Sequence, residues 1–265
     1  MILQGKMITI WSTRGNMGNT MTSIELAKSL SKCKGKTILV DMNLVQPRIG
    51  DYLYLKDFNH TLDNLFPFAL GNNISNDIIE ANCEKLDDLF VLKGTLNPSF
   101  TEFVKPEVLD VVIQALKDNF TYIVVDVHSS LNNSGTYTAL QHSDEVYILL
   151  HRDLFSILSL SDITPFLFSV FNKDKFKLLF NKDRKDIYME KTEIEKNLNM
   201  ISIGSLPYIP NIYNFINKGE YLNLEDKKEY KEYGEILDNL VAKYISLGDE
   251  PINKKKKFKM FWKKK

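Results

Sequence analysis

Short apolar runs alternate with segments of helical periodicity along almost the whole chain. Strands are predicted at 7–11, 37–41, 89–93, 121–127, 145–150, 176–181 and 201–206. Helices are predicted near 18–33, 61–70, 75–82, 106–118, 134–142, 154–172 and 187–199, with a last one from about 226 to 247. Nearly continuous apolar strands such as Tyr122-Ile123-Val124-Val125 are typical of parallel sheets buried on both faces. The pattern predicts an α/β fold with a doubly covered, mostly parallel sheet and ligand loops at the carboxyl ends of its strands.

The length and composition favour one domain with a short extension. A chain of 265 residues with 44% hydrophobic residues can bury a complete core. We expect a single domain over residues 1–247, followed by a linker and tail at 248–265. No run of about 18 apolar residues occurs, and the first residues lack a signal-peptide pattern. These features favour a cytoplasmic protein.

The segment Ser12-Thr13-Arg14-Gly15-Asn16-Met17-Gly18-Asn19-Thr20 resembles a phosphate-binding loop. It lies between a predicted strand and a predicted helix, where free backbone N–H groups at a helix N-terminus can hold an anion. The residue before Thr20 is Asn19, whereas a standard loop has a lysine that reaches the β- and γ-phosphates. We therefore expect a site that holds a nucleotide, with binding weakened by Asn19, and hydrolyses it poorly. The alternative is a glycine-containing turn that binds no ligand.

Two predicted strands end in an acid. A carboxylate at Asp126 follows four apolar residues and is costly to bury unless a cation or hydrogen bonds meet it. Asp126 is therefore a candidate magnesium ligand, together with the hydroxyl of Thr20. The other strand ends at Asp41, with Asn43 two residues later. An amide at position 43 can hold a water molecule but cannot accept a proton at neutral pH. The alternative for Asp41 is a strand-end acid that caps the next turn.

These motifs together resemble those of the MinD/ParA superfamily of deviant P-loop ATPases. The family's loop reads roughly K-G-G-x-G-K-[ST]-[ST], and its first lysine reaches across a dimer. On that pattern Arg14 replaces the first lysine, Asn16 replaces a glycine, and Asn19 replaces the second lysine. Arginine keeps the charge and adds a bidentate fork, while asparagine tolerates a positive φ. The resemblance implies a homodimer, ATP and Mg²⁺ as cofactors, and nucleotide contacts from Gly15, Asn16, Met17, Gly18, Asn19, Thr20 and Met21.

The resemblance also assigns roles outside the loop. The family's D-x-D pair matches Asp41 and Asn43, so an amide stands where the family has the acid that orients the attacking water. Arg14, Asp41 and Asn43 then form the catalytic set, with a severe loss of turnover expected. Asp126 matches the acid that holds the Mg²⁺ shell.

Two later segments extend the resemblance to the nucleotide base and to a subgroup. Lys177-Leu178-Leu179-Phe180-Asn181 resembles the strand whose terminal asparagine, here Asn181, reads the adenine edge. Gly204-Ser205-Leu206-Pro207 resembles the segment that flanks the base, with Pro207 beside it. Within the superfamily the chain looks most similar to the CpaE/TadZ-like pilus-assembly group. That similarity rests on the lost loop lysine, on Val91-Leu92-Lys93-Gly94 before a helix that starts with Pro106-Glu107, and on Ser143-Asp144-Glu145-Val146.

The charge of the chain is distributed unevenly. Residues 254–265 hold eight lysines and no acid, interleaved with Phe258, Met260, Phe261 and Trp262. The chain has 34 basic and 34 acidic residues, so the rest carries a net charge of −8. Such a tail suits an anionic membrane surface, where each lysine contributes about 1 kcal/mol and aromatic side chains enter the interface. The alternatives are a disordered solubilising tail and a nucleic-acid-binding tail, which the acidic body disfavours.

The sequence as a whole predicts a nucleotide-binding, dimerising localisation factor with little or no ATPase activity. It would lie at the inner face of the cell membrane and recruit or position a pilus or secretion machine. One alternative is an active MinD/ParA-type ATPase that regulates division, flagella or plasmid partition, with Arg14 in place of the lost lysine. A second alternative is a nucleotide-free scaffold. Turnover separates the first two, and equilibrium ATP binding separates the first from the third.

Overall fold

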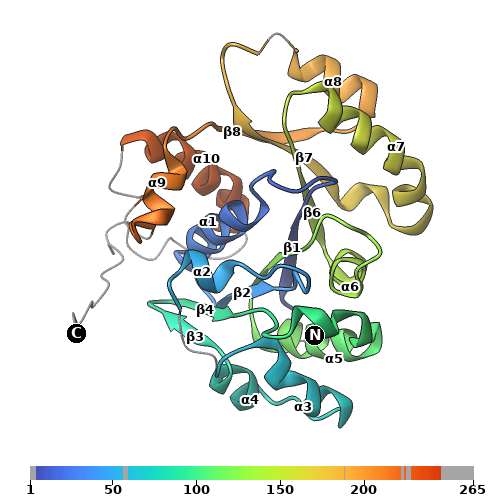
Figure 1. Cartoon of the computed structure of the whole chain (residues 1–265), viewed down its shortest axis with the longest axis vertical. Coiled ribbons are helices and arrows are strands. Elements are labelled where there is room, and N and C mark those ends of the chain that lie inside the picture. The colour runs from blue at the N-terminus through green and yellow to red at the C-terminus, as the bar shows by residue number, and fades with distance from the viewer. Residues whose placement is uncertain (1–3, 56–58, 188, 222–223, 225–227, 246–265) are drawn as a thin grey trace.

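An eight-stranded sheet forms the centre of the molecule, in the order β3-β4-β2-β5-β1-β6-β7-β8 (Figure 1). The computed structural model describes residues 4–55, 59–187, 189–221, 224 and 228–245. All neighbouring strands are parallel except β3 and β4. The strands are β1 (Lys6–Trp11), β2 (Thr37–Asp41), β3 (Glu84–Leu86), β4 (Leu89–Leu92), β5 (Tyr122–Asp126), β6 (Glu145–Leu150), β7 (Phe176–Asp183) and β8 (Ser202–Pro207).

Helices cover both faces of the sheet, and each face has its own apolar core. One face carries α1 (Asn19–Ser31), α2 (Ile49–Tyr52), α9 (Ile212–Asn217) and α10 (Lys228–Ile245). The other carries α3 (Phe66–Leu70), α4 (Asn76–Ala81), α5 (Pro106–Asn119), α6 (Ser134–His142), α7 (Leu154–Val170) and α8 (Lys191–Leu198). Three 3₁₀ turns complete the described part: η1 (Leu62–Leu65), η2 (Pro98–Phe103) and η3 (Lys173–Lys175). The predicted doubly covered α/β fold is confirmed.

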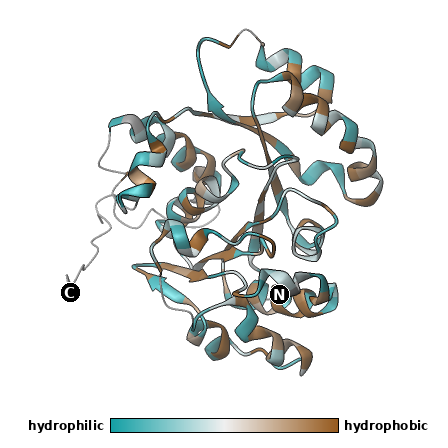
Figure 2. Cartoon of the chain, viewed as in Figure 1, coloured by the Kyte–Doolittle hydropathy of each residue, from teal (hydrophilic) through white to brown (hydrophobic). Residues whose placement is uncertain are grey.

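The central strands are apolar on both sides, as the sequence predicts. Every residue of β2 and of β5 is buried, and Figure 2 shows hydrophobic colour along the middle of the sheet. Removing this surface from water stabilises the fold by roughly 25 cal/mol for each Å² of apolar area. None of the helices in the described part of the chain is both long and apolar enough to cross a bilayer. The predicted tail, residues 248–265, lies outside the described residues.

Several details differ from the sequence prediction. The short helices α2 and α9 were not among the helices predicted from periodicity. The antiparallel strand β3 was not predicted, because a three-residue edge strand shows too short an apolar alternation. Helix α8 begins at Lys191 and not at 187. The guanidinium of Arg152 explains the later start, since it donates to the carbonyl oxygens of Arg184 (2.7 Å), Ile187 (3.3 Å) and Met189 (2.8 Å). Those bonds hold the segment as a loop.

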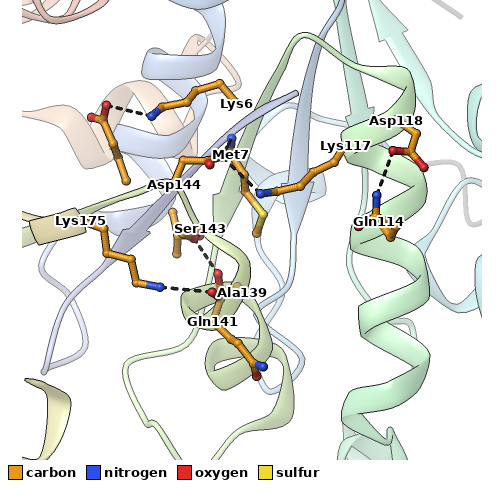
Figure 3. A network of polar contacts seen from close by, with 12 residues as sticks. Lys6, Met7, Gln114, Lys117, Asp118, Ala139, Gln141, Ser143, Asp144 and Lys175 are labelled. Atoms are coloured by element: carbon orange, nitrogen blue, oxygen red, sulfur yellow. Dashed lines mark hydrogen bonds and ion pairs between the residues drawn. The ribbon is translucent and has the colours of Figure 1, made fainter. Parts of the chain in front are cut away.

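The amino-terminal edge of the sheet is closed by a polar network (Figure 3). Asp144 accepts hydrogen bonds from the backbone N–H of Met7 at 2.7 Å and from Lys117 Nζ at 3.3 Å. Lys175 Nζ donates to the last carbonyls of α6, at Leu140 (2.6 Å) and Gln141 (3.2 Å). Asp144, which supported the subgroup resemblance, thus joins β1 to α5. The charged groups at this edge have structural partners, so the candidate site lies at the carboxyl edge.

Candidate nucleotide and magnesium site

The predicted phosphate loop connects β1 to α1 at the carboxyl edge of the sheet. Two of its residues are left-handed, Asn16 with φ of 62° and Gly18 with φ of 97°. The expectation that asparagine replaces a glycine at a position of positive φ is confirmed. A Cβ atom on Gly18 would lie 2.3 Å from Nδ2 of Asn181, so only glycine fits this position. Alternating left-handed residues turn successive N–H groups toward a common point, which favours an anion.

Helix α1 begins without a side-chain cap. Its N-cap, Gly18, offers no side-chain hydrogen bond, and the first turn contains no acid. It shares the lack of a side-chain cap with α2, α3, α5, α8 and α9, whereas α4, α6 and α7 are capped by side chains of Ser75, Asn133 and Asp153. The first N–H groups of a helix need partners from outside the helix. At α1 they remain available to an anionic ligand, with the helix dipole favouring negative charge.

The candidate magnesium ligands lie beside this helix start. The hydroxyl of Thr20 donates to Asp126 Oδ2 at 2.7 Å. The second oxygen, Oδ1, is buried and makes no hydrogen bond of ordinary geometry with the described residues, although the Ser23 hydroxyl and the Val127 N–H lie near enough to the carboxyl group to favour its ionised form. Burial and then the charge of Asp41 raise the pKa of Asp126 well above its usual value. A divalent cation would meet the orphaned oxygen and favour the ionised form, so Thr20 and Asp126 fit the Mg²⁺ that the resemblance implies.

Asp41 lies directly beside Asp126 on the neighbouring strand, and both are almost fully buried. Its carboxylate accepts backbone N–H groups of Asn43 (3.1 Å), Arg48 (2.9 Å) and Ile49 (3.0 Å). Burial raises its pKa to about 7, although those three hydrogen bonds oppose the shift. This geometry supports the alternative that Asp41 caps the turn after its strand. A direct catalytic role for Asp41 stays a prediction.

Asn43 lies in the turn that Asp41 organises. Its Oδ1 accepts the backbone N–H of Gln46 at 3.0 Å, so the amide holds the loop between β2 and α2. Gly94 packs against this turn, and a Cβ atom there would lie 2.4 Å from Pro47 Cβ and 3.1 Å from Asp41 Cγ. The side chain of Asn43 therefore stabilises this turn. The contact of this side chain with the attacking water stays a prediction.

Arg14 lies at the rim of the loop and points toward the start of α7. Its guanidinium is 3.5 Å from Asp153 Oδ1 and 3.4 Å from Ser156 Oγ. The Arg14 and Asp153 side chains are 46% and 43% exposed, so water screens the pair and it adds little stability. Arg14 is accessible to a second subunit, but its contact across a dimer stays a prediction.

The predicted base-reading residues lie at adjacent strand ends. Asn181 Nδ2 donates to the backbone oxygen of Met17 at 2.7 Å, so this amide braces the phosphate loop. Pro207 pairs in register with Asp183, and the Tyr208 N–H donates to the Asp183 oxygen at 2.9 Å. The ends of β7 and β8 thus meet beside the loop. Their contacts with adenine stay predictions.

The other residues predicted to contact the nucleotide differ in which of their atoms are accessible. The side chain of Met17 is buried in the core on the α1 face, so it offers only its backbone, whereas Met21 packs against that core and stays partly exposed. Gly15 has open space around it. Asn19 presents a buried Oδ1 that has no hydrogen-bond partner among the described residues. Position 19 therefore contains an unsatisfied amide where the family has a lysine.

Two residues near the loop were not predicted from the sequence. Lys182 Nζ donates to the Asn16 carbonyl at 2.6 Å, and the imidazole of His151 contacts the backbone of Met17. Burial and the charge of Lys182 lower the pKa of His151, so this histidine is neutral at pH 7. Each residue directly follows a predicted apolar strand, at 145–150 and 176–181. That position at the carboxyl edge of the sheet was the sequence signal that could have identified them. Lys182 also has a left-handed φ of 51°, which no periodicity reveals.

The fold and the loop define a P-loop nucleotide-binding protein of the α/β class. A family model described as an AAA domain matches residues 5–180. The chain belongs to that family, which is the MinD/ParA type of P-loop ATPase. The match spans the loop and β1 through most of β7, so it includes the helix and the strand that carry Thr20 and Asp126.

Individual relatives agree with this family. The septum site-determining protein MinD of Helicobacter pylori is 24% identical over 90% of this chain and 91% of its own length. A Borrelia burgdorferi protein described as a plasmid partition protein, solved with AMPPNP, is 26% identical at a TM-score of 0.72, covering 91% of this chain and 100% of its own. MinD of Pyrococcus horikoshii complexed with Mg-ADP has a TM-score of 0.75 at 17% identity, covering 92% and 98%.

The buried carboxylates lead to a prediction about pH. We expect Asp126→Asn to stabilise the nucleotide-free protein, by an amount that grows as pH rises above the ordinary pKa of an aspartate toward the raised pKa of the folded state. In the unfolded chain Asp126 ionises near its ordinary pKa, whereas in the folded chain its raised pKa resists ionisation. A raised folded pKa costs stability that appears above the unfolded pKa and increases with pH. Chemical unfolding of both proteins across this range measures the difference. A gain that stays constant with pH would contradict the ionisation argument.

Proposed function

We propose that this protein binds Mg·ATP and acts as a nucleotide-dependent localisation factor with little or no ATPase activity. The observation that carries the proposal is that the site keeps the backbone architecture of a phosphate loop but has asparagine, and not lysine, at position 19. The α1 N-terminus is uncapped and Asp126 has an orphaned oxygen, whereas position 19 presents an amide. Backbone N–H groups of the loop would hold phosphate, and Thr20 with Asp126 would hold Mg²⁺. A bound Mg²⁺ would neutralise phosphate charge and orient the triphosphate.

Slow turnover follows from two neutral side chains. Asn19 offers no positive charge to a phosphoryl group in the transition state, and such charge contributes strongly to phosphoryl transfer. Asn43 is held by the Gln46 N–H and cannot accept a proton at neutral pH. Titration with ATP and a steady-state turnover assay test the proposal. Weak but measurable ATP binding with background hydrolysis supports it, and the absence of ATP binding would favour the scaffold.

We further propose that ATP holds two subunits together and that Arg14 completes the partner's site. The accessible guanidinium and its weak ion pair with Asp153 support this step. A persistent dimer would present its partners with a long-lived surface, because hydrolysis would seldom release it. This part rests on ATP binding.

The machine that the protein serves has two candidates. A pilus or secretion machine is supported by the sequence resemblance to the CpaE/TadZ-like group. A spatial regulator of division or partition is supported by the relatives, which are a septum site-determining protein and a plasmid partition protein. Purification of the tagged full chain with Mg·ATP, followed by identification of co-purifying proteins, distinguishes a pilus ATPase from division or partition proteins.

Truncation after Pro251 is expected to abolish binding to vesicles that contain anionic lipid. The removed residues include all eight lysines of 254–265, and surface attraction falls with each lysine lost. Two tails on one dimer should bind more tightly than one through effective concentration, so ATP should strengthen binding and salt should weaken it. Vesicle sedimentation of the full and truncated chains measures this. Equal binding by both, or no preference for anionic lipid, would contradict a membrane tail.

A further inference from the structure

Lys182 is a partly buried lysine beside the candidate phosphate loop, and no acidic side chain of the described residues pairs with it. Its Nζ donates to the Asn16 carbonyl at 2.6 Å. Lys182 is the second-last residue of β7, at the carboxyl end of the strand. None of the ion pairs among the described residues includes Lys182. The adjacent Asp183 does not neutralise it, because its carboxylate is paired with Arg152 Nε at 2.6 Å and with Lys191 Nζ at 2.6 Å.

The backbone around Lys182 is arranged to direct it at the loop. Lys182 has a φ of 51°, a left-handed conformation that is uncommon for lysine. Asn181 and Lys182 donate to the consecutive carbonyls of Met17 and Asn16. Both residues therefore contact the loop that contains left-handed Asn16 and Gly18. These two donors at the end of β7 hold the loop in the conformation that directs its backbone N–H groups toward one point.

The electrostatics of this position favour an anionic ligand. Burial lowers the pKa of the Lys182 ammonium, and its charge in turn helps to lower the pKa of His151. A cation that loses hydration and gains no carboxylate is costly unless an anion approaches it. The loop beside it lacks the usual lysine, since position 19 is an asparagine whose Oδ1 is buried and unpaired within the described chain.

We propose that Lys182 supplies the positive charge that Asn19 does not provide at the phosphate loop, while it holds the Asn16 carbonyl. The inference rests on the proposed ATP binding. Lys182 is thus a positioning and charge-supplying residue for the polyphosphate, contributed by β7 and not by the loop itself. Phosphate affinity then survives the loss of the loop lysine, whereas the transition-state contact of that lysine does not.

A double-mutant cycle tests the compensation. ATP affinity is measured by calorimetric titration with Mg²⁺ for wild type, Lys182→Met, Asn19→Lys and the double variant. Lys182→Met is expected to weaken ATP binding about tenfold in the wild-type background. In the Asn19→Lys background, Lys182→Met should weaken ATP binding by less than about threefold. An equal loss of ATP affinity in both backgrounds would mean that Lys182 only stabilises the loop, and it would overturn the proposal.

Further measurements separate charge from structure. Lys182→Gln keeps a hydrogen-bond donor without charge, so it should weaken ATP binding like Lys182→Met and reduce its salt dependence. Adenosine binding should change little, because it has no phosphate. Lys185→Met, an exposed lysine nearby, is the matched control. If the wild type binds ATP and Lys182→Met binds it with the same affinity, this inference is overturned and the proposed function is not. Absence of ATP binding by the wild type overturns it together with the proposed function.

Discussion

Restoring two side chains is expected to convert this protein into an ATPase. The wild type should hydrolyse Mg·ATP at or near background. Asn19→Lys combined with Asn43→Asp should raise turnover about tenfold or more, because the two residues serve different parts of phosphoryl transfer. The lysine would place a charge near the phosphates, and the carboxylate would orient and polarise the attacking water.

The structure indicates that both substitutions can be accommodated. Asn19 is the first residue of α1 and has an unsatisfied oxygen, so no hydrogen bond of Oδ1 with the described residues is lost. At position 43 a carboxylate can still accept the Gln46 N–H that the amide accepts now. The added acid lies near two buried carboxylates, Asp41 and Asp126, so the gain should require Mg²⁺.

Steady-state phosphate release measures the effect. Asn197→Lys with Asn172→Asp is the matched control, since both residues are exposed and Asn172 also caps a turn, through the Asp174 N–H at 3.0 Å. The control should stay at background. A wild-type rate similar to that of ordinary family members would contradict the weakened site, and an inactive double variant would show that more than these two groups is missing.

Arg14→Ala is expected to abolish dimerisation in the presence of ATP while leaving the monomer folded. Arg14 lies on a partly exposed loop, and its pair with Asp153 is screened by water, so its loss should change stability by less than about 1 kcal/mol. Across a dimer the same guanidinium would meet the partner's triphosphate, where a charge-assisted bidentate contact is strong. The variant therefore separates dimerisation from folding.

Sedimentation velocity with and without Mg·ATP measures the oligomeric state. Arg14→Lys should retain part of the dimer because the charge is kept. Lys36→Ala serves as the control, since Lys36 forms an exposed ion pair with Glu80 at 2.6 Å, just before β2 at the opposite edge. A dimer that forms without ATP and persists in Arg14→Ala would favour the scaffold.

Much of the fold could be predicted because its signals are local. Apolar runs such as that of β5 indicate buried parallel strands, and their spacing predicts the helices between them. The loop was recognisable because glycine and asparagine mark backbone positions of positive φ, which Asn16 and Gly18 have. Strand β3 escaped prediction, since pairing with β4 and not its own three residues makes it a strand.

The chemistry of the site depended on tertiary structure. Asp41 could cap a turn or serve catalysis, and only the folded loop shows its three backbone N–H partners. In the sequence, Lys182 is the residue directly after the strand predicted at 176–181, and no role was assigned to it. Its proximity to Asn16, 166 residues away, arises from the parallel placement of β7 and a left-handed backbone.

The sequence by itself therefore determined the sheet, the loop and the missing lysine, because periodicity, conformational preference and residue identity are properties of short segments. Tertiary structure decided which charges meet. Hydrogen bonds, burial and ion pairing depend on distances between residues far apart in the chain, and those distances exist only once the strand ends gather at one edge. The loop between β1 and α1, which has asparagine and not lysine at position 19, and Lys182 of β7, which has no ion pair among the described residues, become parts of one site for this reason.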